Sequence, residues 1–181
     1  ALALEFSSRH GSELRYVSAW GKWFRWTGQV WTEENTLLAF DLARVIAREA
    51  ALQAGGKAAK AIASAKTVAA VAGLAKADRA HAVTPDIWDA DAWLLNTPAG
   101  TVNLRTGSMH VHQQDNHITK LTGISPDSHM PTPVWTDFLL SITDNNVELI
   151  AFLKRISGYA LTGDTREHAL FFLYGLGANG K

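Results

Sequence analysis

Apolar residues recur at helical spacing in two stretches of the chain. In the first stretch, four aliphatic residues lie along one helical face: Leu38, Leu42, Val45 and Leu52. Thr32 precedes them as an N-cap, and Gly55–Gly56 interrupts the pattern before an alanine-rich continuation. In the second stretch, four apolar residues with spacing i, i+3, i+4 and i+7 follow a proline: Trp135, Phe138, Leu139 and Ile142. The pattern therefore predicts helical segments over 33–76 and 132–162.

A first β-unit is predicted near residues 14–31. Lys22–Trp26 and Gln29–Trp31 flank Thr27-Gly28, and this spacing suits a two-residue hairpin because glycine accepts a positive φ. Large aromatic side chains crowd into this stretch. They indicate a small sheet anchored by its aromatic rings.

A second β-unit is predicted near residues 94–121. Thr101–Leu104 and Ser108–His112 alternate as strands do, and they are joined by a turn at Arg105–Gly107. Ile118–Leu121 is the expected third strand. Together with the long helical stretches, these units predict an α+β fold in which helices dominate.

The last residues carry a phosphate-binding pattern. An apolar run, Ala169–Tyr174, leads into a glycine, four residues and then Gly-Lys, as in a P-loop that leaves a buried strand. The residues of this nucleotide-binding pattern are Gly175, Gly177, Ala178, Asn179, Gly180 and Lys181. Glycines let phosphate oxygens approach backbone N–H groups, and Lys181 would reach the β- and γ-phosphates. Because the magnesium-binding Ser or Thr would come next, we expect the start of a truncated P-loop ATPase; a chance match is the alternative.

Composition bounds these expectations. The chain has 181 residues, of which 47% are hydrophobic, enough for a sizeable core. It contains no cysteine, so neither a disulfide nor a thiolate zinc site is expected. No apolar run approaches the roughly 20 residues of a membrane-spanning helix, and we expect no membrane partner.

Charge is unevenly distributed, although 17 Lys and Arg balance 17 Asp and Glu. The excess of basic residues is concentrated between Leu42 and Lys76, where Glu49 is the only acid. The candidate contacts for DNA phosphates in this region are Arg44, Arg48, Lys57, Lys60 and Lys66. The alternative is an ordinary solvated helical face.

Two further residues, Trp23 and Arg25, share a strand face and are candidates for stacking on the bases of single-stranded DNA. Their alternatives are a role in the core and the stacking of sugars. We expect no metal site. The residue types that could bind a metal are three histidines and three aspartates: His110, His112, His117, Asp86, Asp89 and Asp91. The histidines, however, lack an acidic or thiolate partner pattern. The aspartates are better explained as helix caps.

Several segments, taken in order, resemble one family. Trp20-Gly21-Lys22-Trp23, Trp93–Pro98, Gly100–Gly107, Gly158–Gly163 and Gly175–Lys181 follow the order seen in phage and plasmid primase-helicases and in the poxvirus-type primase. The resemblance is to the accessory domain before a superfamily 3 helicase, and Asn179 before Gly180-Lys181 looks like that branch's P-loop. It covers nearly the whole chain.

The resemblance implies a parent protein that unwinds DNA as an ATP-driven homo-oligomeric ring, with ATP and Mg as cofactors, in the cytoplasm of a bacterium or an infected host cell. It implies an accessory domain over 1–163 and the start of the ATPase over 164–181. We expect this chain alone to bind no cofactor and to lack activity. Its expected role is to bind DNA or couple it to the ring; an interaction or oligomerisation module that does not contact DNA is the alternative.

Overall fold

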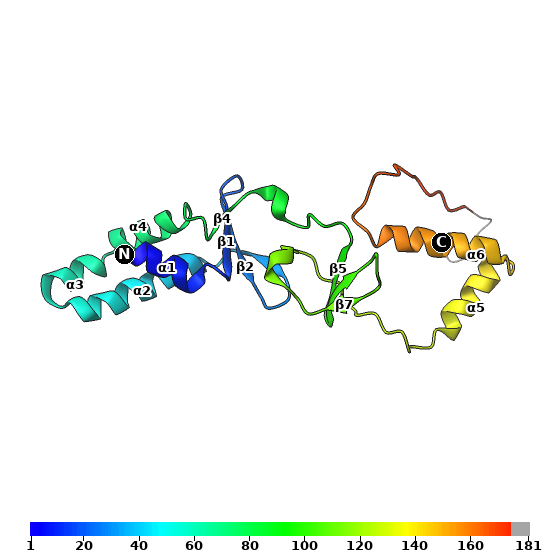
Figure 1. Ribbon diagram of the computed structural model, residues 1–181, viewed down its shortest axis with the longest axis horizontal. Coiled ribbons are helices and arrows are strands. Elements are labelled where there is room, and N and C mark those ends of the chain that lie inside the picture. The colour runs from blue at the N-terminus through cyan, green and yellow to red at the C-terminus, as the bar shows by residue number, and fades with distance from the viewer. Residues whose placement is uncertain (175–181) are drawn as a thin grey trace. The chain divides into compact units, whose positions relative to one another are not determined.

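A computed structural model describes residues 1–174 (Figure 1). The chain forms two compact units, each with its own sheet. Unit 1 contains residues 1–90 and 112–121, and unit 2 contains residues 91–111 and the chain from 122 onward. The α+β class predicted from the sequence is confirmed by the mixture of helices and two small sheets.

Unit 1 combines a four-stranded sheet with a group of helices. Its strands, in the order β3-β2-β1-β4, are β3 Trp31–Glu34, β2 Lys22–Trp26, β1 Leu14–Val17 and β4 Ala82–Val83. β1, β2 and β3 run antiparallel, and the short β4 pairs parallel to β1. Its helices are α1 Leu2–His10, α2 Leu38–Ala54, α3 Gly56–Ile62 and α4 Ala65–Ala75, with short 3-10 turns at Pro85–Ile87 and Gln114–Asn116.

The predicted hairpin forms, but its loop is longer than expected. Trp26 pairs with Trp31 across the turn, so the loop has four residues, and Gly28 adopts a φ of 97° in it. The Thr27 N–H donates to the Val30 carbonyl oxygen at 3.0 Å and closes this loop.

The predicted start of the helical region at residue 33 is wrong. Thr32 and Glu33 lie in β3, where they pair with β2, and α2 begins only at Leu38. The carboxylate of Glu34 accepts the backbone N–H groups of Thr36 at 2.6 Å and Leu38 at 3.0 Å. An acidic side chain thus satisfies a donor that the first turn of the helix leaves without a partner.

The predicted aliphatic stripe of α2 is confirmed only in part, because Leu38 and Leu42 are half-buried and pack against the core. Val45 is 41% exposed and Leu52 is 87% exposed. The buried positions of this helix are Ala39, Ala43, Ile46, Ala47 and Ala51. Small side chains let the helices pack closely, and α2 contacts both α1 and α4.

A histidine lies in the core between the helices and the sheet of unit 1. The side chain of His81 is fully buried, and its ring centroid lies 5.4 Å from those of Phe6 and Trp23. Its Nδ1 is 2.9 Å from the carbonyl oxygen of Leu14, whereas its Nε2 has no hydrogen-bond partner in the described residues. Burial lowers the pKa of His81, and the nearby Arg15 acts in the same direction.

The buried His81 predicts that unit 1 loses stability in mild acid. The pKa of His81 in the folded state lies below that of the unfolded chain, so its neutral form stabilises the fold above about pH 6.5, and this contribution is lost as the pH falls toward the folded pKa. His10, whose pKa is also lowered by burial, acts in the same sense. We expect His81→Phe to flatten the pH dependence of the unfolding free energy below pH 6.5 by up to about 1.4 kcal/mol per pH unit.

Urea unfolding at several pH values measures this effect. His129→Gln is the control, because the side chain of His129 is 96% exposed in unit 2. Equal slopes for the wild type and His81→Phe would contradict the prediction.

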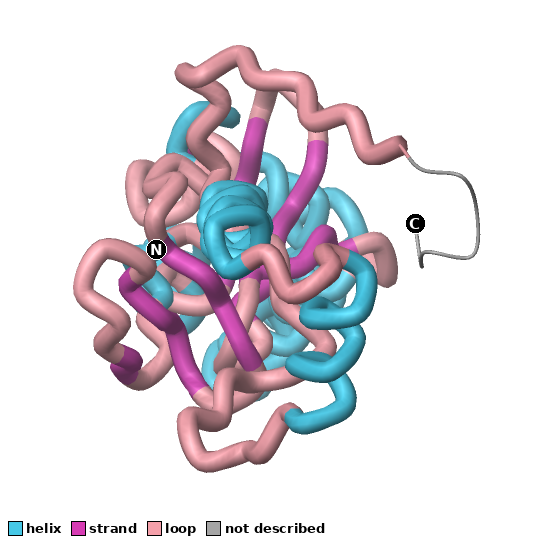
Figure 2. Tube along the Cα trace, turned by 90° about the vertical axis from the view of Figure 1, so that its right-hand side faces the viewer, coloured by secondary structure: helices cyan, strands magenta, loops and turns pink. Residues whose placement is uncertain are grey.

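Unit 2 contains a three-stranded antiparallel sheet and two helices. The strands, in the order β5-β6-β7, are β5 Leu94–Thr97, β6 Gly100–Asn103 and β7 Met109–His110. The helices are α5 Pro133–Ile142 and α6 Val147–Ala160, and Figures 1 and 2 show them inclined to one another. The predicted strands on either side of the turn at 105–107 and the predicted helical segment 132–162 are confirmed.

Two predicted strands do not form. Ile118–Leu121 belongs to unit 1, where the Ile118 carbonyl oxygen accepts the Trp31 N–H at 2.9 Å but no ladder of bonds follows. Residues 169–174 form no strand, because no strand among residues 1–174 pairs with them. The segment before these residues is bonded within unit 2, where the Gly163 N–H donates to the Ala92 carbonyl oxygen at 2.9 Å. The expected domain boundary near residue 163 stays a prediction.

Gly100 is required by the sheet of unit 2. It adopts a φ of 154°, and a Cβ at this position would lie 2.5 Å from the carbonyl oxygen of His110. We expect Gly100→Ala to destabilise this sheet by about 1–3 kcal/mol, because the two strands would have to separate. Hydrogen exchange over residues 94–110 reports this change.

Gly158→Ala is the matched control in the same unit. A Cβ there meets no atom within 4 Å, and Gly158 lies inside α6. We expect this substitution to stabilise the helix by about 0.5–1 kcal/mol. If Gly100→Ala exchanged no faster than the wild type, the close approach would not constrain the sheet.

No single helix among residues 1–174 is long and apolar enough to cross a membrane. α3 and α4 together reach the required length and composition, but they are bent by 51°.

Candidate nucleic-acid interface

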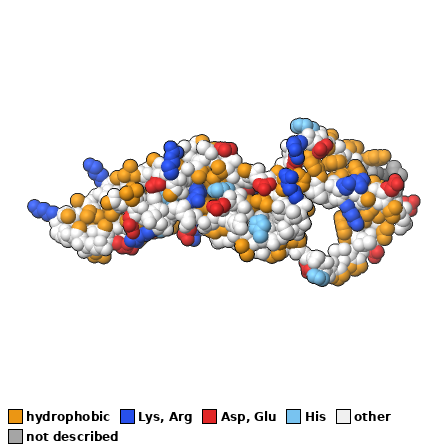
Figure 3. All heavy atoms as spheres, viewed as in Figure 1, with side chains coloured by type: hydrophobic (Ala, Val, Ile, Leu, Met, Phe, Trp, Pro, Cys, Tyr) orange, Lys and Arg blue, Asp and Glu red, His pale blue; other side chains and the backbone are white. Residues whose placement is uncertain are grey.

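The predicted phosphate contacts of the helical region lie on consecutive helices of unit 1. We call these five residues the basic hairpin: Arg44 and Arg48 on α2, Lys57 and Lys60 on α3, and Lys66 on α4. All five are exposed, and Figure 3 shows Lys and Arg side chains that project into solvent from the helical end of unit 1. α2 contacts both α3 and α4, so the structure brings these residues onto one helical substructure.

The spacing of the charges follows the helices. Arg44 and Arg48 are four residues apart on α2 and therefore share one side of it. Lys57 and Lys60 are three residues apart on α3 and share a side in the same way. Lys66 lies in the first turn of α4, next to Ser64, whose hydroxyl accepts the N–H of Thr67 and caps that helix.

Acidic residues do not neutralise most of this surface. Between Ala50 and Ala77 the sequence contains no Asp or Glu. Glu49, the one acid between Leu42 and Lys76, forms an ion pair with Arg9 of α1 at 2.6 Å. Arg44 pairs with Asp41, whereas the other four members of the basic hairpin form no ion pair within residues 1–174. These four cations are therefore free to meet an anionic partner.

Several other cations of unit 1 are already engaged. Lys22 pairs with Glu33 at 2.7 Å. The guanidinium of Arg15 donates to backbone carbonyl oxygens, including that of Ala80 at 3.2 Å, and lies 5.1 Å from the centroid of the Trp31 ring. Burial lowers the pKa of Arg15, as expected for a charge removed from water. Arg25, Arg79 and Lys120 are exposed and also form no ion pair within residues 1–174, but the largest consecutive set of such cations lies on α2, α3 and α4.

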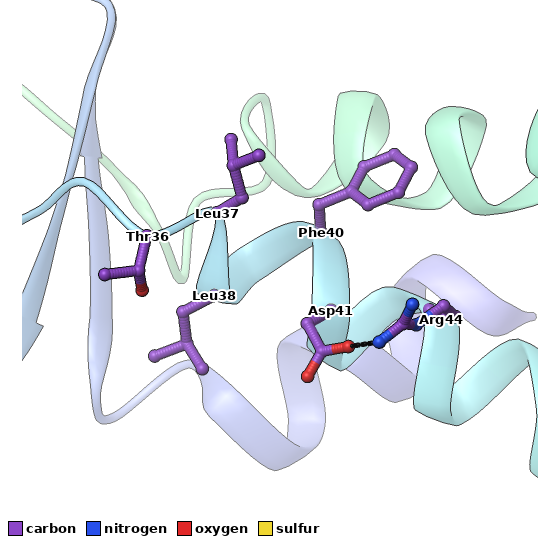
Figure 4. A pocket seen from close by; sticks show the side chains of 6 residues that line it. All are labelled: Thr36, Leu37, Leu38, Phe40, Asp41 and Arg44. Atoms are coloured by element: carbon purple, nitrogen blue, oxygen red, sulfur yellow. Dashed lines mark hydrogen bonds and ion pairs between the residues drawn. The ribbon is translucent and has the colours of Figure 1, made fainter.

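A shallow hollow opens at the start of α2, beside the basic hairpin (Figure 4). Its volume is about 370 Å³, and Leu37, Phe40 and the Asp41–Arg44 ion pair line it. Leu37 adopts a left-handed φ of 64° and is 76% exposed. The ion pair at its edge reduces the charge that Arg44 offers, so we assign the hollow no ligand.

The structure places the two candidates on β2 differently. Trp23 is half-buried, and its ring centroid lies 5.1 Å from that of Tyr16 and 6.4 Å from that of Phe6. Its indole therefore packs in the core, and most of its surface is not available to a base. Arg25 is exposed, although it pairs with the buried Leu14 on the neighbouring strand.

The histidines and aspartates form no metal site within residues 1–174. Asp89 has a structural role: its carboxylate accepts the backbone N–H of Thr119 at 2.8 Å and the hydroxyl of Thr119 at 2.5 Å. Asp91 accepts the N–H of Trp93 at 3.0 Å. These contacts hold loops and neither carboxylate caps a helix, so the cap interpretation is wrong for Asp89 and Asp91; Asp86 does lie in the first turn of the 3-10 helix Pro85–Ile87.

The predicted nucleotide-binding residues, Gly175, Gly177, Ala178, Asn179, Gly180 and Lys181, lie outside the described residues.

Trp20 is an exposed aromatic residue that was not among the predicted contacts for DNA. This residue sits in the turn between β1 and β2 and is 47% exposed. The Gly21-Lys22 pair after it signals a turn, and a large side chain at a turn is more often exposed than one on a strand. That signal alone would have separated Trp20 from Trp23.

Comparison with known proteins agrees with the resemblance noted above. Residues 3–144 match the family described as D5 N terminal like. No curated protein shows significant similarity to the chain. The match covers all of unit 1 except its first two residues, and it extends through α5 of unit 2. Since it spans well over half of the sequence, the chain belongs to the D5 N terminal like family and is part of a D5-like primase-helicase replication protein.

Proposed function

We propose that this chain holds DNA for a replicative primase-helicase, and that the basic hairpin of unit 1 contacts the DNA phosphates. The observation that supports this is a set of four cations on α2, α3 and α4 that form no ion pair within residues 1–174: Arg48, Lys57, Lys60 and Lys66. Each phosphate that a Lys or Arg neutralises releases counterions, which gives affinity without dependence on sequence. Family membership supports a role at DNA.

The proposal extends to the last residues of the sequence. Residues 175–181 would begin the P-loop of a superfamily 3 ATPase, which would bind ATP and Mg in a homo-oligomeric ring in the cytoplasm.

Titration of labelled DNA at several salt concentrations tests the DNA-binding role. We expect binding at low salt, with the logarithm of the affinity falling by about 0.7 per contacted phosphate for each tenfold rise in salt on a single strand. With four contacts the slope would be about −2.8. Failure to bind at low salt, or binding that ignores salt, would reject the proposal.

A second candidate function is assembly with other protein chains without contact to DNA. It is favoured by the apolar surface of α5, where Val134 is 81% exposed and Trp135 is 56% exposed. These residues and Phe138 line an apolar hollow of about 580 Å³. Light scattering of the wild type and of Trp135→Ala separates the candidates: only the assembly role requires a concentration-dependent mass that the substitution lowers.

A further inference from the structure

Trp20 is the exposed end of a series of aromatic rings that runs into the core of unit 1. Its ring centroid lies 5.8 Å from that of Phe24, and the Phe24 centroid lies 4.6 Å from that of Trp88. Trp88 in turn contacts Trp31 at 5.7 Å. Trp88, Phe24 and Trp31 are each less than a tenth exposed, whereas Trp20 is 47% exposed. One side of the outermost ring is thus supported by the core and much of the remainder meets solvent.

The turn that carries Trp20 is short and well defined. The N–H of Trp20 donates to the Val17 carbonyl oxygen, and the N–H of Gly21 to that of Ser18, both at 3.2 Å. Gly21 adopts a φ of 67°, and Val17 pairs with Lys22 to close the turn. The backbone therefore fixes where the indole begins, and Phe24 limits where the ring can turn. A ring held in this way loses little conformational entropy when a second ring stacks on it.

The surroundings of Trp20 do not suit a protein interface. Its neighbours Ser18, Ala19 and Gly21 are small and exposed, so the indole stands alone and not within a broad apolar patch. Stable protein contacts bury an anchor together with a surrounding set of residues. A single supported ring can instead stack on one planar group.

We propose that Trp20 stacks on an unpaired base, which makes single-stranded nucleic acid the preferred ligand of unit 1. This inference rests on the proposed function, since the phosphates would be held by the basic hairpin of the same unit. Lys22, the charged residue next to this turn, forms an ion pair with Glu33 at 2.7 Å. The turn therefore offers a ring for stacking and little charge for phosphates. In a duplex both faces of each base are covered by neighbouring pairs, which leaves no face for the indole except at an end.

Three variants test the proposal by titration with a thymidine oligonucleotide and with a relaxed, closed circular duplex, which has neither ends nor unpaired bases. Trp20→Ala is expected to weaken binding of the single strand by about 5- to 150-fold and to leave the affinity for the duplex and the salt slope unchanged. Trp20→Phe keeps a stacking face and should retain most of the affinity. Phe172→Ala removes an exposed aromatic ring from unit 2 and should change neither affinity.

Two results would overturn the proposal. If Trp20→Ala bound the single strand as tightly as the wild type, stacking by Trp20 would be rejected while phosphate binding stood. Equal weakening of single-strand and duplex binding by Trp20→Ala would also reject stacking. If the wild type bound neither ligand at low salt, the proposed function itself would fail. Circular dichroism of Trp20→Ala confirms that a loss of binding does not reflect unfolding.

Discussion

Replacement of Arg48, Lys57, Lys60 and Lys66 by alanine is expected to abolish most of the salt-dependent affinity of the chain for DNA. Four phosphate contacts correspond to a slope of about −2.8 on a single strand, so between 50 and 200 mM salt the wild type should lose about 50-fold more affinity than the variant. The effect should be equal for all sequences, because phosphates carry no sequence information. Fluorescence anisotropy at several salt concentrations measures both slopes.

The substitutions should not unfold the helices. All four residues are exposed, and alanine has a higher helix propensity than lysine or arginine. A matched control compares two pairs of charges on single helices: Lys57→Ala with Lys60→Ala on α3, and Lys154→Ala with Arg155→Ala on α6. Only the pair on α3 should reduce the slope. Equal losses from both pairs would mean that net charge matters and the basic hairpin does not.

Trp31→Ala is expected to cost unit 1 about 3–5 kcal/mol of unfolding free energy, the range for truncation of a large buried ring. Trp31 is 1% exposed, and its indole Nε1 donates to the Gln114 carbonyl oxygen at 2.9 Å. The backbone N–H of Trp31 donates to the Ile118 carbonyl oxygen, also at 2.9 Å. The ring therefore ties the returning segment 112–121 to the edge strand β3. A loss of this size is a large part of the stability of an ordinary domain.

Trp20→Ala is the control for this prediction. It removes the same indole from an exposed turn and should change the unfolding free energy by less than about 1 kcal/mol. Urea unfolding followed by circular dichroism measures both variants, and hydrogen exchange shows whether residues 112–121 open in Trp31→Ala. If the two substitutions cost the same, Trp31 would not hold that segment.

Local signals predicted some elements well. The β-hairpin formed by β2 and β3 was predictable because a glycine turn and alternating aromatic residues are visible within one short stretch of sequence. The same is true of α5, which begins at a proline and has a regular apolar pattern. The predicted start of α2 was wrong because Thr32-Glu33-Glu34 resembles a helix cap, yet pairing with β2 decides its conformation. Pairing between strands is not visible in the local sequence.

Burial was harder to predict than periodicity. In α2 the leucine and valine side chains gave the stronger apolar signal, but the core is formed by Ala43, Ala47 and their neighbours because α1 and α4 approach that side. The site shows the same limit. Alternation placed Trp23 and Arg25 on one face of β2, but only the structure shows that the helices cover the indole. The strand expected at 169–174 failed for a related reason: a strand requires a partner.

Mapping of the DNA contact on the backbone tests the central claim most directly. NMR spectra of the chain, recorded while a thymidine oligonucleotide is added at low salt, report which amides sense the ligand. We predict that the shifts concentrate in α2, α3 and α4, around Arg48, Lys57, Lys60 and Lys66, and that they disappear as salt is raised. Shifts confined to unit 2, or no shifts at all, would contradict the assignment of these helices as the surface that holds DNA.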